Sequence, residues 1–193
     1  MKRLILLLAL LVLAGCASLY TNLLKARDIV GLPSMQEMWP GVYVGNWADR
    51  QDIENLKAHK VKVCINLAWE IRDPGQSWPL KAQELSFKDG ILFMKDGMVD
   101  YASPDNERLL KDAVGMAVQS LKAHLIVMGG CEGARNRTYL WLICLRMKLF
   151  GETAAVAEQK ILAVRPEMAL HGWEDDLLAK IEKEGVSQWL AAK

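Results

Sequence analysis

The residues best suited to carry out chemistry lie in one short stretch, residues 131–138. Cys131 follows an apolar run at 125–128, and apolar residues at helical spacing continue from 139 to 149. This order predicts a strand, a tight turn and a helix, with Cys131 where the strand gives way to the helix. Backbone N–H groups and the helix dipole favour an anion at such a turn. The same field favours the thiolate form of a cysteine.

Arg137 lies six residues after Cys131, at the far end of the same turn. Its planar guanidinium can donate two parallel hydrogen bonds to a bound oxyanion. A thiolate, a turn of amides and an arginine together describe a phosphate site with a nucleophile at its floor. The residues expected to line this turn and contact the substrate are Glu132, Gly133, Ala134, Arg135 and Asn136.

The pattern of Cys131, five residues, Arg137 and then Thr138 resembles the phosphate-binding loop of the cysteine-dependent protein tyrosine phosphatases, in particular the dual-specificity branch. The resemblance extends from about residue 39 to residue 184. It implies hydrolysis of phosphomonoesters, phosphotyrosine or phosphoserine/threonine, through a cysteinyl-phosphate intermediate. It also implies catalytic roles for Cys131, Arg137 and Thr138, and a mechanism that needs neither a metal ion nor a cofactor.

Two positions depart from the family pattern. Gly130 stands where the family usually has histidine before the nucleophile, and Ala134 stands where glycine is usual, with Gly133 one place early. An alanine that must adopt unusual backbone angles costs about 1 kcal/mol. These departures keep a second hypothesis open, a catalytically inactive phosphatase-like module that binds phosphorylated ligands. A rhodanese-like sulfur transferase is disfavoured, because those loops are usually one residue shorter.

A phosphatase of this type also needs an acid to protonate the leaving oxygen. In the family this aspartate lies on the loop between a strand and the following helix. Residues 91–94 are expected to form that strand, so Asp96 is the best match and Asp100 the second candidate. Asp105 is better explained as an acidic residue at the start of a helix, because Pro104 precedes it.

The resemblance implies an α/β fold for residues 39–193, a central mostly parallel sheet of about four to five strands with helices on both faces. Strands are expected near 42–45, 61–67, 91–94 and 125–128. Helices are expected at 49–59, from 103 onward, at 139–149, at 153–164 and at 174–184. Residues 69–86 are polar, contain two prolines and are expected to form a surface excursion.

The N-terminus predicts export and lipid attachment. Residues 1–15 combine a positive start with a short apolar run and are interpreted as a signal peptide. Their end resembles the lipobox of bacterial lipoproteins, with Cys16 as the lipidated residue. Residues 16–38 are expected to form a tether, and Ala17 resembles outer-membrane sorting. The predicted location is the bacterial cell envelope, lipid-anchored and facing the periplasm. An uncleaved anchor or a plain secretory signal is the alternative.

The charge of the chain limits the kind of partner that it can bind. The formal net charge is +1 and the basic residues are scattered along the sequence, which argues against a nucleic-acid face. The expected partner is a phosphorylated protein or a small phosphomonoester.

The cysteines do not predict a disulfide framework. Cys64, Cys131 and Cys144 remain after Cys16, and an odd number of cysteines is a poor basis for disulfides. Cys64 is expected in the core, with a Cys64–Cys131 bridge as the less favoured alternative.

The three histidines are expected to pack or to lie at the surface. His171 has no acid or nucleophile near it in sequence, and His59 and His124 lie at the ends of predicted elements. The sequence contains no metal-ligand spacing.

Overall fold

The computed structural model describes residues 35–46, 52–68, 85–99, 101–131 and 133–192, and these belong to one compact unit, Ser34–Lys193. The predicted signal peptide, Cys16 and the predicted tether up to residue 34 lie outside the described residues. The predicted domain boundaries at 16 and 39 therefore stay predictions.

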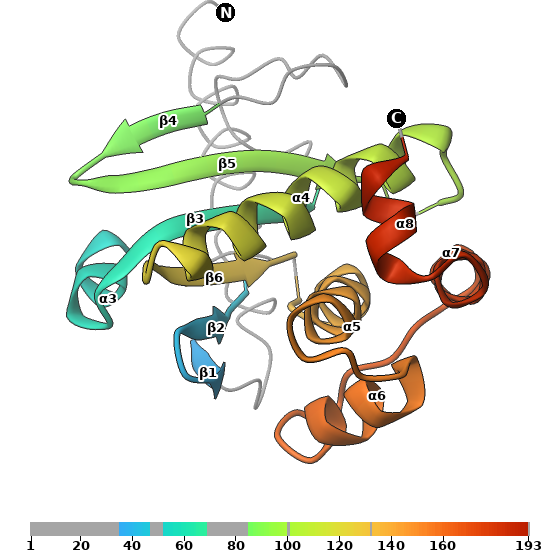
Figure 1. Cartoon of the computed structure of the whole chain (residues 1–193). Coiled ribbons are helices and arrows are strands. Elements are labelled where there is room, and N and C mark those ends of the chain that lie inside the picture. The colour runs from blue at the N-terminus through green and yellow to red at the C-terminus, as the bar shows by residue number, and fades with distance from the viewer. Residues whose placement is uncertain (1–34, 47–51, 69–84, 100, 132, 193) are drawn as a thin grey trace, which may run out of the picture. The chain divides into compact units, whose positions relative to one another are not determined.

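The core of the described region is a six-stranded sheet in the order β1-β2-β6-β3-β5-β4 (Figure 1). The strands are β1 Gln36–Trp39, β2 Val42–Val44, β3 Val61–Ala68, β4 Leu85–Lys88, β5 Ile91–Met98 and β6 Ile126–Gly130. The four inner strands pair in parallel, whereas the edge strands β1 and β4 pair antiparallel with their neighbours. The expected mostly parallel sheet of about four to five strands is corrected to a mixed sheet of six.

Both unpredicted strands are edge strands that join their neighbours through tight turns. Gly41 connects β1 to β2 with φ of +85°. Asp89 and Gly90 connect β4 to β5 with φ of +54° and +76°, and two successive positive φ angles are the signature of a two-residue hairpin turn that favours Asp-Gly. The end of the expected surface excursion, from Leu85, is therefore a strand.

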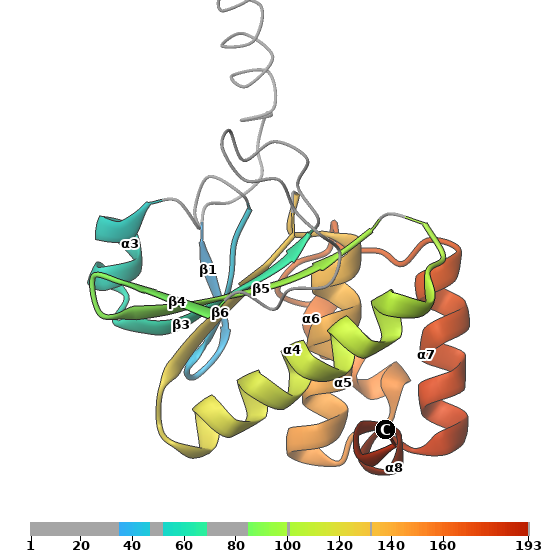
Figure 2. The same cartoon turned by 90° about the horizontal axis from the view of Figure 1, so that it is seen from above.

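Six helices accompany the sheet in the part of the chain that the structure describes. They are α3 Ile53–Ala58, α4 Pro104–Lys122, α5 Asn136–Phe150, α6 Ala154–Leu162, α7 Trp173–Glu184 and α8 Val186–Ala191. Five of them match the expected helices within a few residues, and α8 was not predicted. Viewed along the sheet, α4 to α8 lie on one side and α3 on the other (Figure 2).

The two faces of the sheet bury unequal cores. The side chains of Val63, Ile65 and Leu67 on β3 enter a large cluster with α4 and α5. Cys64 on the same strand enters a small cluster with Leu56 of α3. The prediction of helices on both faces is confirmed, and among the described residues a six-residue helix, α3, covers the small face.

The start of α4 and the end of α5 follow from local chemistry. Ser103 caps α4 by accepting a hydrogen bond of 3.3 Å from the Asp105 N–H, and Pro104 occupies the first turn, where its missing N–H costs nothing. At the C-terminal end of α5, Gly151 adopts φ of +65° and stops the helix. These two helices flank the turn that carries Cys131.

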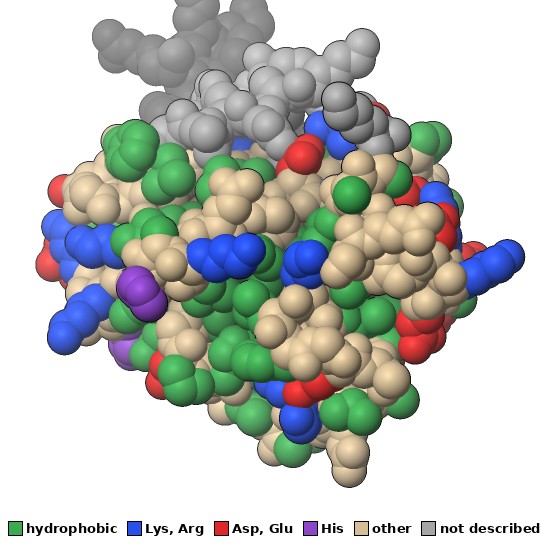
Figure 3. All heavy atoms as spheres, viewed as in Figure 1, with side chains coloured by type: hydrophobic (Ala, Val, Ile, Leu, Met, Phe, Trp, Pro, Cys, Tyr) green, Lys and Arg blue, Asp and Glu red, His purple; other side chains and the backbone are tan. Residues whose placement is uncertain are grey.

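The prediction that the protein has no nucleic-acid face stays a prediction. On the face shown in Figure 3, lysine and arginine side chains are scattered among apolar and neutral ones. Among the helices of the described residues, none is both long and apolar enough to cross a membrane.

Candidate active site

Cys131 lies directly after β6, at the carboxyl end of the parallel strands, the edge where open α/β sheets place their ligands. Its side chain is buried, with 3% of its surface exposed. On the neighbouring strand β3, Asn66 is in register with Gly130. The predicted order of strand, turn and helix is confirmed, because α5 begins at Asn136.

Thr138 contacts the cysteine through two hydrogen bonds. Its hydroxyl accepts one from the Cys131 N–H at 2.9 Å and donates one to the Cys131 Sγ at 3.1 Å. The Thr138 side chain is fully buried. A donated hydrogen bond in a water-poor setting stabilises negative charge on the acceptor, so this hydroxyl is placed to support a thiolate.

Arg137 lies in the first turn of α5 and is 95% buried, with only 5% of its surface exposed. Its Nη1 donates a hydrogen bond of 2.6 Å to the main-chain carbonyl of Met98, the last residue of β5. One nitrogen of the guanidinium is thereby held by a strand far away in sequence. The structure thus joins Thr138 to Cys131 by hydrogen bonds and places Arg137 next to Thr138 in the first turn of α5.

Ala134 carries the unusual backbone of the turn. Its φ is +50°, in the left-handed region, and its side chain is buried. The expectation that the alanine in the usual glycine position needs unusual backbone angles is confirmed. Ala134 occupies the left-handed position, whereas Gly133 does not have a positive φ. Such a conformation costs a residue with a Cβ about 1 kcal/mol.

The N-terminal end of α5 presents backbone donors to this turn. Arg135, at the N-cap, makes no side-chain hydrogen bond to the first turn, and that turn contains no acidic residue. The first N–H groups of a helix lack intrahelical partners and bind anions. Arg135 is exposed and Asn136 half-buried, while Glu132 lies outside the described residues.

The acid loop differs from its prediction. β5 continues to Met98, so Asp96 lies within the strand and not on a loop. The strand is longer because Lys95 and Met98 still pair with β3, a long-range pairing that the local sequence does not reveal. The connection to α4 begins at Val99, which makes Asp100 the first acidic residue after the strand. The Asp96 side chain and the whole of Asp100 lie outside the description, so the choice between them stays a prediction.

Three contacts that shape the site were not anticipated. A Cβ added to Gly129 would lie 2.4 Å from the ring of Trp141, so this glycine is needed for α5 to pack against β6. Asn106 of α4 binds the backbone that follows β5. Glu174 of α7 is buried, and burial raises its pKa although the charge of Arg137 acts in the opposite direction. No sequence spacing links any of the three to the turn.

The other cysteines have structural positions. Cys64 packs in the small cluster with α3, and no disulfide joins the described cysteines. The alternative of a Cys64–Cys131 bridge is therefore not realised. Cys144 is fully buried within α5, and burial raises the pKa of its thiol.

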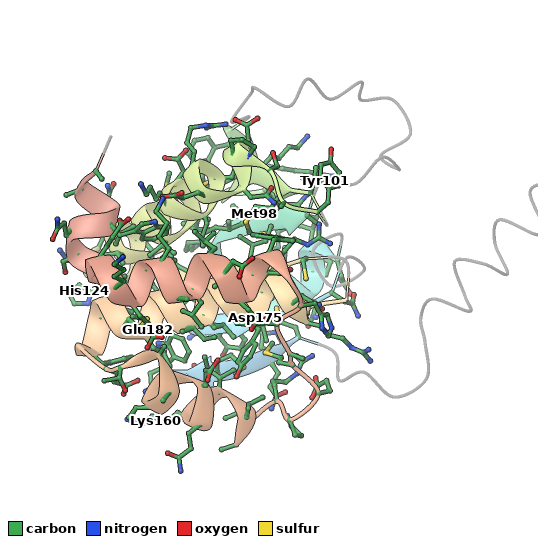
Figure 4. The ribbon with its side chains drawn as sticks, turned by 90° about the vertical axis from the view of Figure 1, so that its right-hand side faces the viewer. Met98, Tyr101, His124, Lys160, Asp175 and Glu182 are labelled. Atoms are coloured by element: carbon green, nitrogen blue, oxygen red, sulfur yellow. The ribbon has the colours of Figure 1, made fainter. Side chains whose placement is uncertain are left out.

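All three histidines are at least partly exposed. His124 is exposed in the α4–β6 connection, on the side of the molecule opposite Tyr101, as Figure 4 shows. The ring of His59 packs against Tyr43 at 5.4 Å between centroids, and His171 is exposed. These positions agree with packing and surface roles. Within the described ranges, no group of three or more acidic, histidine or cysteine side chains is arranged to hold a metal ion.

Comparison with known proteins gives matches in structure only. Neither the protein-family models nor the curated proteins contain a match to the sequence. Human DUSP28 is 17% identical over 79% of this chain and 95% of its own, with a TM-score of 0.66. The fold is that of the dual-specificity phosphatases.

Two further solved structures show the same likeness. A mouse putative dual-specificity phosphatase complexed with zinc tungstate is 17% identical, covers 83% of this chain and 94% of its own, and has a TM-score of 0.67. The human tyrosine phosphatase-like serine/threonine/tyrosine-interacting protein is 16% identical, covers 78% and 96%, and has a TM-score of 0.65. At these identities the likeness concerns the fold, and the activity must be argued from the site.

Proposed function

We propose that this protein is a phosphatase that hydrolyses phosphomonoesters through a cysteinyl-phosphate intermediate. The observation that carries the proposal is the contact of Thr138 with both the N–H and the Sγ of Cys131, beside the buried Arg137 of the same helix turn. A purely structural cysteine needs no buried hydroxyl to support a thiolate and no buried guanidinium near it, because both groups are costly to desolvate.

In the first step, the Cys131 thiolate attacks phosphorus, an S–P bond forms and the ester P–O bond breaks. The departing oxygen takes a proton from an aspartic acid, for which Asp96 and Asp100 are the candidates. Arg137 and the first N–H groups of α5 stabilise the charge on the phosphoryl oxygens, which spreads as the bond breaks.

In the second step, water attacks phosphorus and the P–S bond breaks. The carboxylate takes a proton from the water, and the pair of electrons returns to sulfur. The Thr138 hydroxyl, 3.1 Å from the Sγ, stabilises the thiolate as it leaves. Inorganic phosphate is released and the site returns to its first state.

A second candidate function is an inactive module that binds phosphorylated ligands. The observation in its favour is the left-handed backbone of Ala134, because strain in the turn can displace N–H groups from the phosphoryl oxygens. Both candidates share the anion site, and they differ in whether the cysteine reacts.

Turnover by the full chain separates these two functions. We expect hydrolysis of an aryl phosphate, and we expect Cys131→Ser to lower kcat by at least about 1000-fold, the scale at which a nucleophile contributes. Cys64→Ser is the matched control, a buried cysteine in the small cluster, and it should keep its turnover. Rapid acid quench with phosphorus-labelled substrate should trap label on the wild-type protein only. Hydrolysis that survives Cys131→Ser would contradict the proposal, and binding without hydrolysis would support the inactive module.

The site is proposed to act on phosphotyrosine or phosphoserine/threonine in proteins, or on small phosphomonoesters. We further propose that the protein is held at the bacterial cell envelope by lipid on Cys16, facing the periplasm of a cell with an outer membrane. The support is the sequence of residues 1–17. Cys16→Ser should abolish incorporation of labelled fatty acid, and labelling that persists in this variant would contradict the assignment.

A further inference from the structure

Asn106 is a buried polar residue on α4 whose side chain binds only main-chain groups. It has 1% of its surface exposed. Its Oδ1 accepts a hydrogen bond of 3.0 Å from the Val99 N–H, and its Nδ2 donates to the carbonyls of Val99 at 3.2 Å and Tyr101 at 2.9 Å. The acceptor and both donors of the amide are therefore used.

An asparagine is an expensive choice for this position if the position serves packing alone. Asparagine is a poor helix former, and its amide must be removed from water before it gains any partner. Both polar groups of Val99 are bound by the one amide, as a neighbouring strand would bind them. The amide thus continues the pairing of β5 beyond its last residue, Met98, and binds the backbone again at Tyr101.

The segment that Asn106 holds is the one that orients Arg137. The Met98 carbonyl accepts the 2.6 Å hydrogen bond from the Arg137 Nη1, and Val99 follows immediately in the chain. Because the peptide between them is planar and rigid, fixing the Val99 N–H also fixes the direction of the Met98 carbonyl. Figure 4 labels the buried Met98 and the exposed Tyr101, which lie three residues apart in the chain.

We propose that Asn106 is a positioning residue for the phosphate site: it holds the Met98 carbonyl in place and thereby fixes the guanidinium of Arg137 for a tetrahedral oxyanion. The proposal rests on the proposed function of the turn as a phosphate site. Asn106 acts through the backbone and contacts neither the nucleophile nor the anion. Its contribution should therefore be felt in oxyanion affinity and should depend on the presence of Arg137.

The test measures the dissociation constant of tungstate for the full chain, because tungstate binding involves no leaving group and no turnover. Asn106→Ala should weaken binding by roughly 10-fold to 100-fold, the upper bound being about the effect of a 1 Å misplacement. In the Arg137→Lys background the same substitution should change the constant by less than about 3-fold, because residues that act through one interaction are not additive. Equal losses in both backgrounds would overturn the proposal.

Two further variants separate positioning from loss of fold. Asn106→Asp keeps the shape and the acceptor for the Val99 N–H but loses both donors, so it should fold and still bind tungstate more weakly. Ser120→Ala, a buried polar site on the same helix, should leave the constant unchanged. Wild-type affinity in Asn106→Asp, or no Arg137-dependent tungstate binding in the wild-type chain, would overturn the inference. Tungstate binding with this dependence but without hydrolysis would overturn only the phosphatase proposal.

Discussion

The two ends of α5 are built in opposite ways. At the N-terminal end, Arg135 provides no side-chain cap, and the preceding residue Ala134 has a left-handed backbone. At the C-terminal end, Gly151 supplies the left-handed cap without strain and donates its N–H to the Met147 carbonyl at 3.1 Å. One end leaves backbone donors for a ligand, and the other satisfies the helix within the protein.

Side chains reinforce the C-terminal end of α5, which we call the closed end; the N-terminal end, which leaves backbone donors for a ligand, is the open end. Arg146 donates two hydrogen bonds to Glu152, at 2.7 and 2.8 Å, and its guanidinium lies over the rings of Trp39 and Phe150. The same carboxylate also binds Lys160. Stability is thus concentrated where no chemistry is proposed, and the strained, uncapped end is available for binding. Substitutions at the two ends should separate activity from stability.

The largest effect is expected from the acid that serves the open end. Replacing it with asparagine should slow hydrolysis of an alkyl or tyrosyl phosphate by roughly 100-fold to 10,000-fold, because a poor leaving group needs a proton. A strongly activated aryl phosphate should be affected far less. Asp96→Asn and Asp100→Asn are measured with both substrates, and the variant that shows this contrast carries the acid. If both variants slow the two substrates alike, neither aspartate is the acid.

Arg137→Lys comes next in size. Lysine keeps the charge but loses the planar fork and the ordered contact with the Met98 carbonyl, so turnover should fall by at least about 100-fold. The control is Arg135→Lys, an exposed arginine of the same turn, which should have a much smaller effect. Steady-state rates of the two variants provide the measurement. A larger loss in Arg135→Lys would make Arg135 the phosphate ligand.

Glu152→Gln tests the closed end through stability. Hydrogen bonds from Arg146, then the contacts with Lys160, hold the pKa of Glu152 at about 2 against its usual 4.5. The ionised carboxylate therefore stabilises the fold above about pH 4.5, and this contribution is lost as the pH falls toward 2. At pH 7 the variant should lose about 1.5 to 3 kcal/mol of unfolding free energy, the range for hydrogen bonds to charged groups.

Urea unfolding at pH 7 and at pH 3 measures this difference, which should shrink at the lower pH, while turnover at neutral pH stays unchanged. Glu54→Gln is the control, because Glu54 belongs to an exposed pair with Lys57, and such pairs contribute about 0 to 1 kcal/mol. A loss of turnover in Glu152→Gln would mean that the two ends of α5 are coupled.

Ala134→Gly should have the smallest effect, and of the opposite sign. Glycine adopts positive φ without steric cost, so the variant should gain up to about 1 kcal/mol of unfolding free energy. The matched control is Ala155→Gly at an exposed position of α6, which should lose about 0.5 to 1 kcal/mol. Equal losses in both variants would show that the backbone of Ala134 is not strained.

The sequence predicted what depends on neighbours in the chain. The strand, turn and helix around Cys131 follow from local pattern, and the strain at Ala134 follows from one missing glycine. The hairpin at Asp89 and Gly90 also had a local signal, because Asp-Gly between apolar runs is typical of a two-residue turn. Residues 69–86 are rich in polar side chains, and this composition favoured a surface excursion over a strand before the turn.

What the sequence could not reveal depends on contacts between distant elements. The length of β5, and hence the position of Asp96 within a strand, is set by pairing with β3. The role of Asn106 exists only because α4 lies beside the end of β5. In the sequence, Asn106 is an isolated asparagine in an amphipathic helix, and nothing nearby indicates that it binds the backbone after β5. The sequence likewise does not indicate that the charge of Arg137 acts on the buried Glu174.

The close packing of Gly129 against Trp141 also restricts which substitutions this site can accept during evolution. Any side chain added at 129 meets the indole at 2.4 Å. Reducing Trp141 first empties a fully buried space, at a cost of about 3 to 5 kcal/mol for removal of a large aromatic side chain. Each single step is therefore unfavourable, and the two positions form an epistatic pair. Among related chains, a bulkier residue at 129 should occur only together with a smaller one at 141.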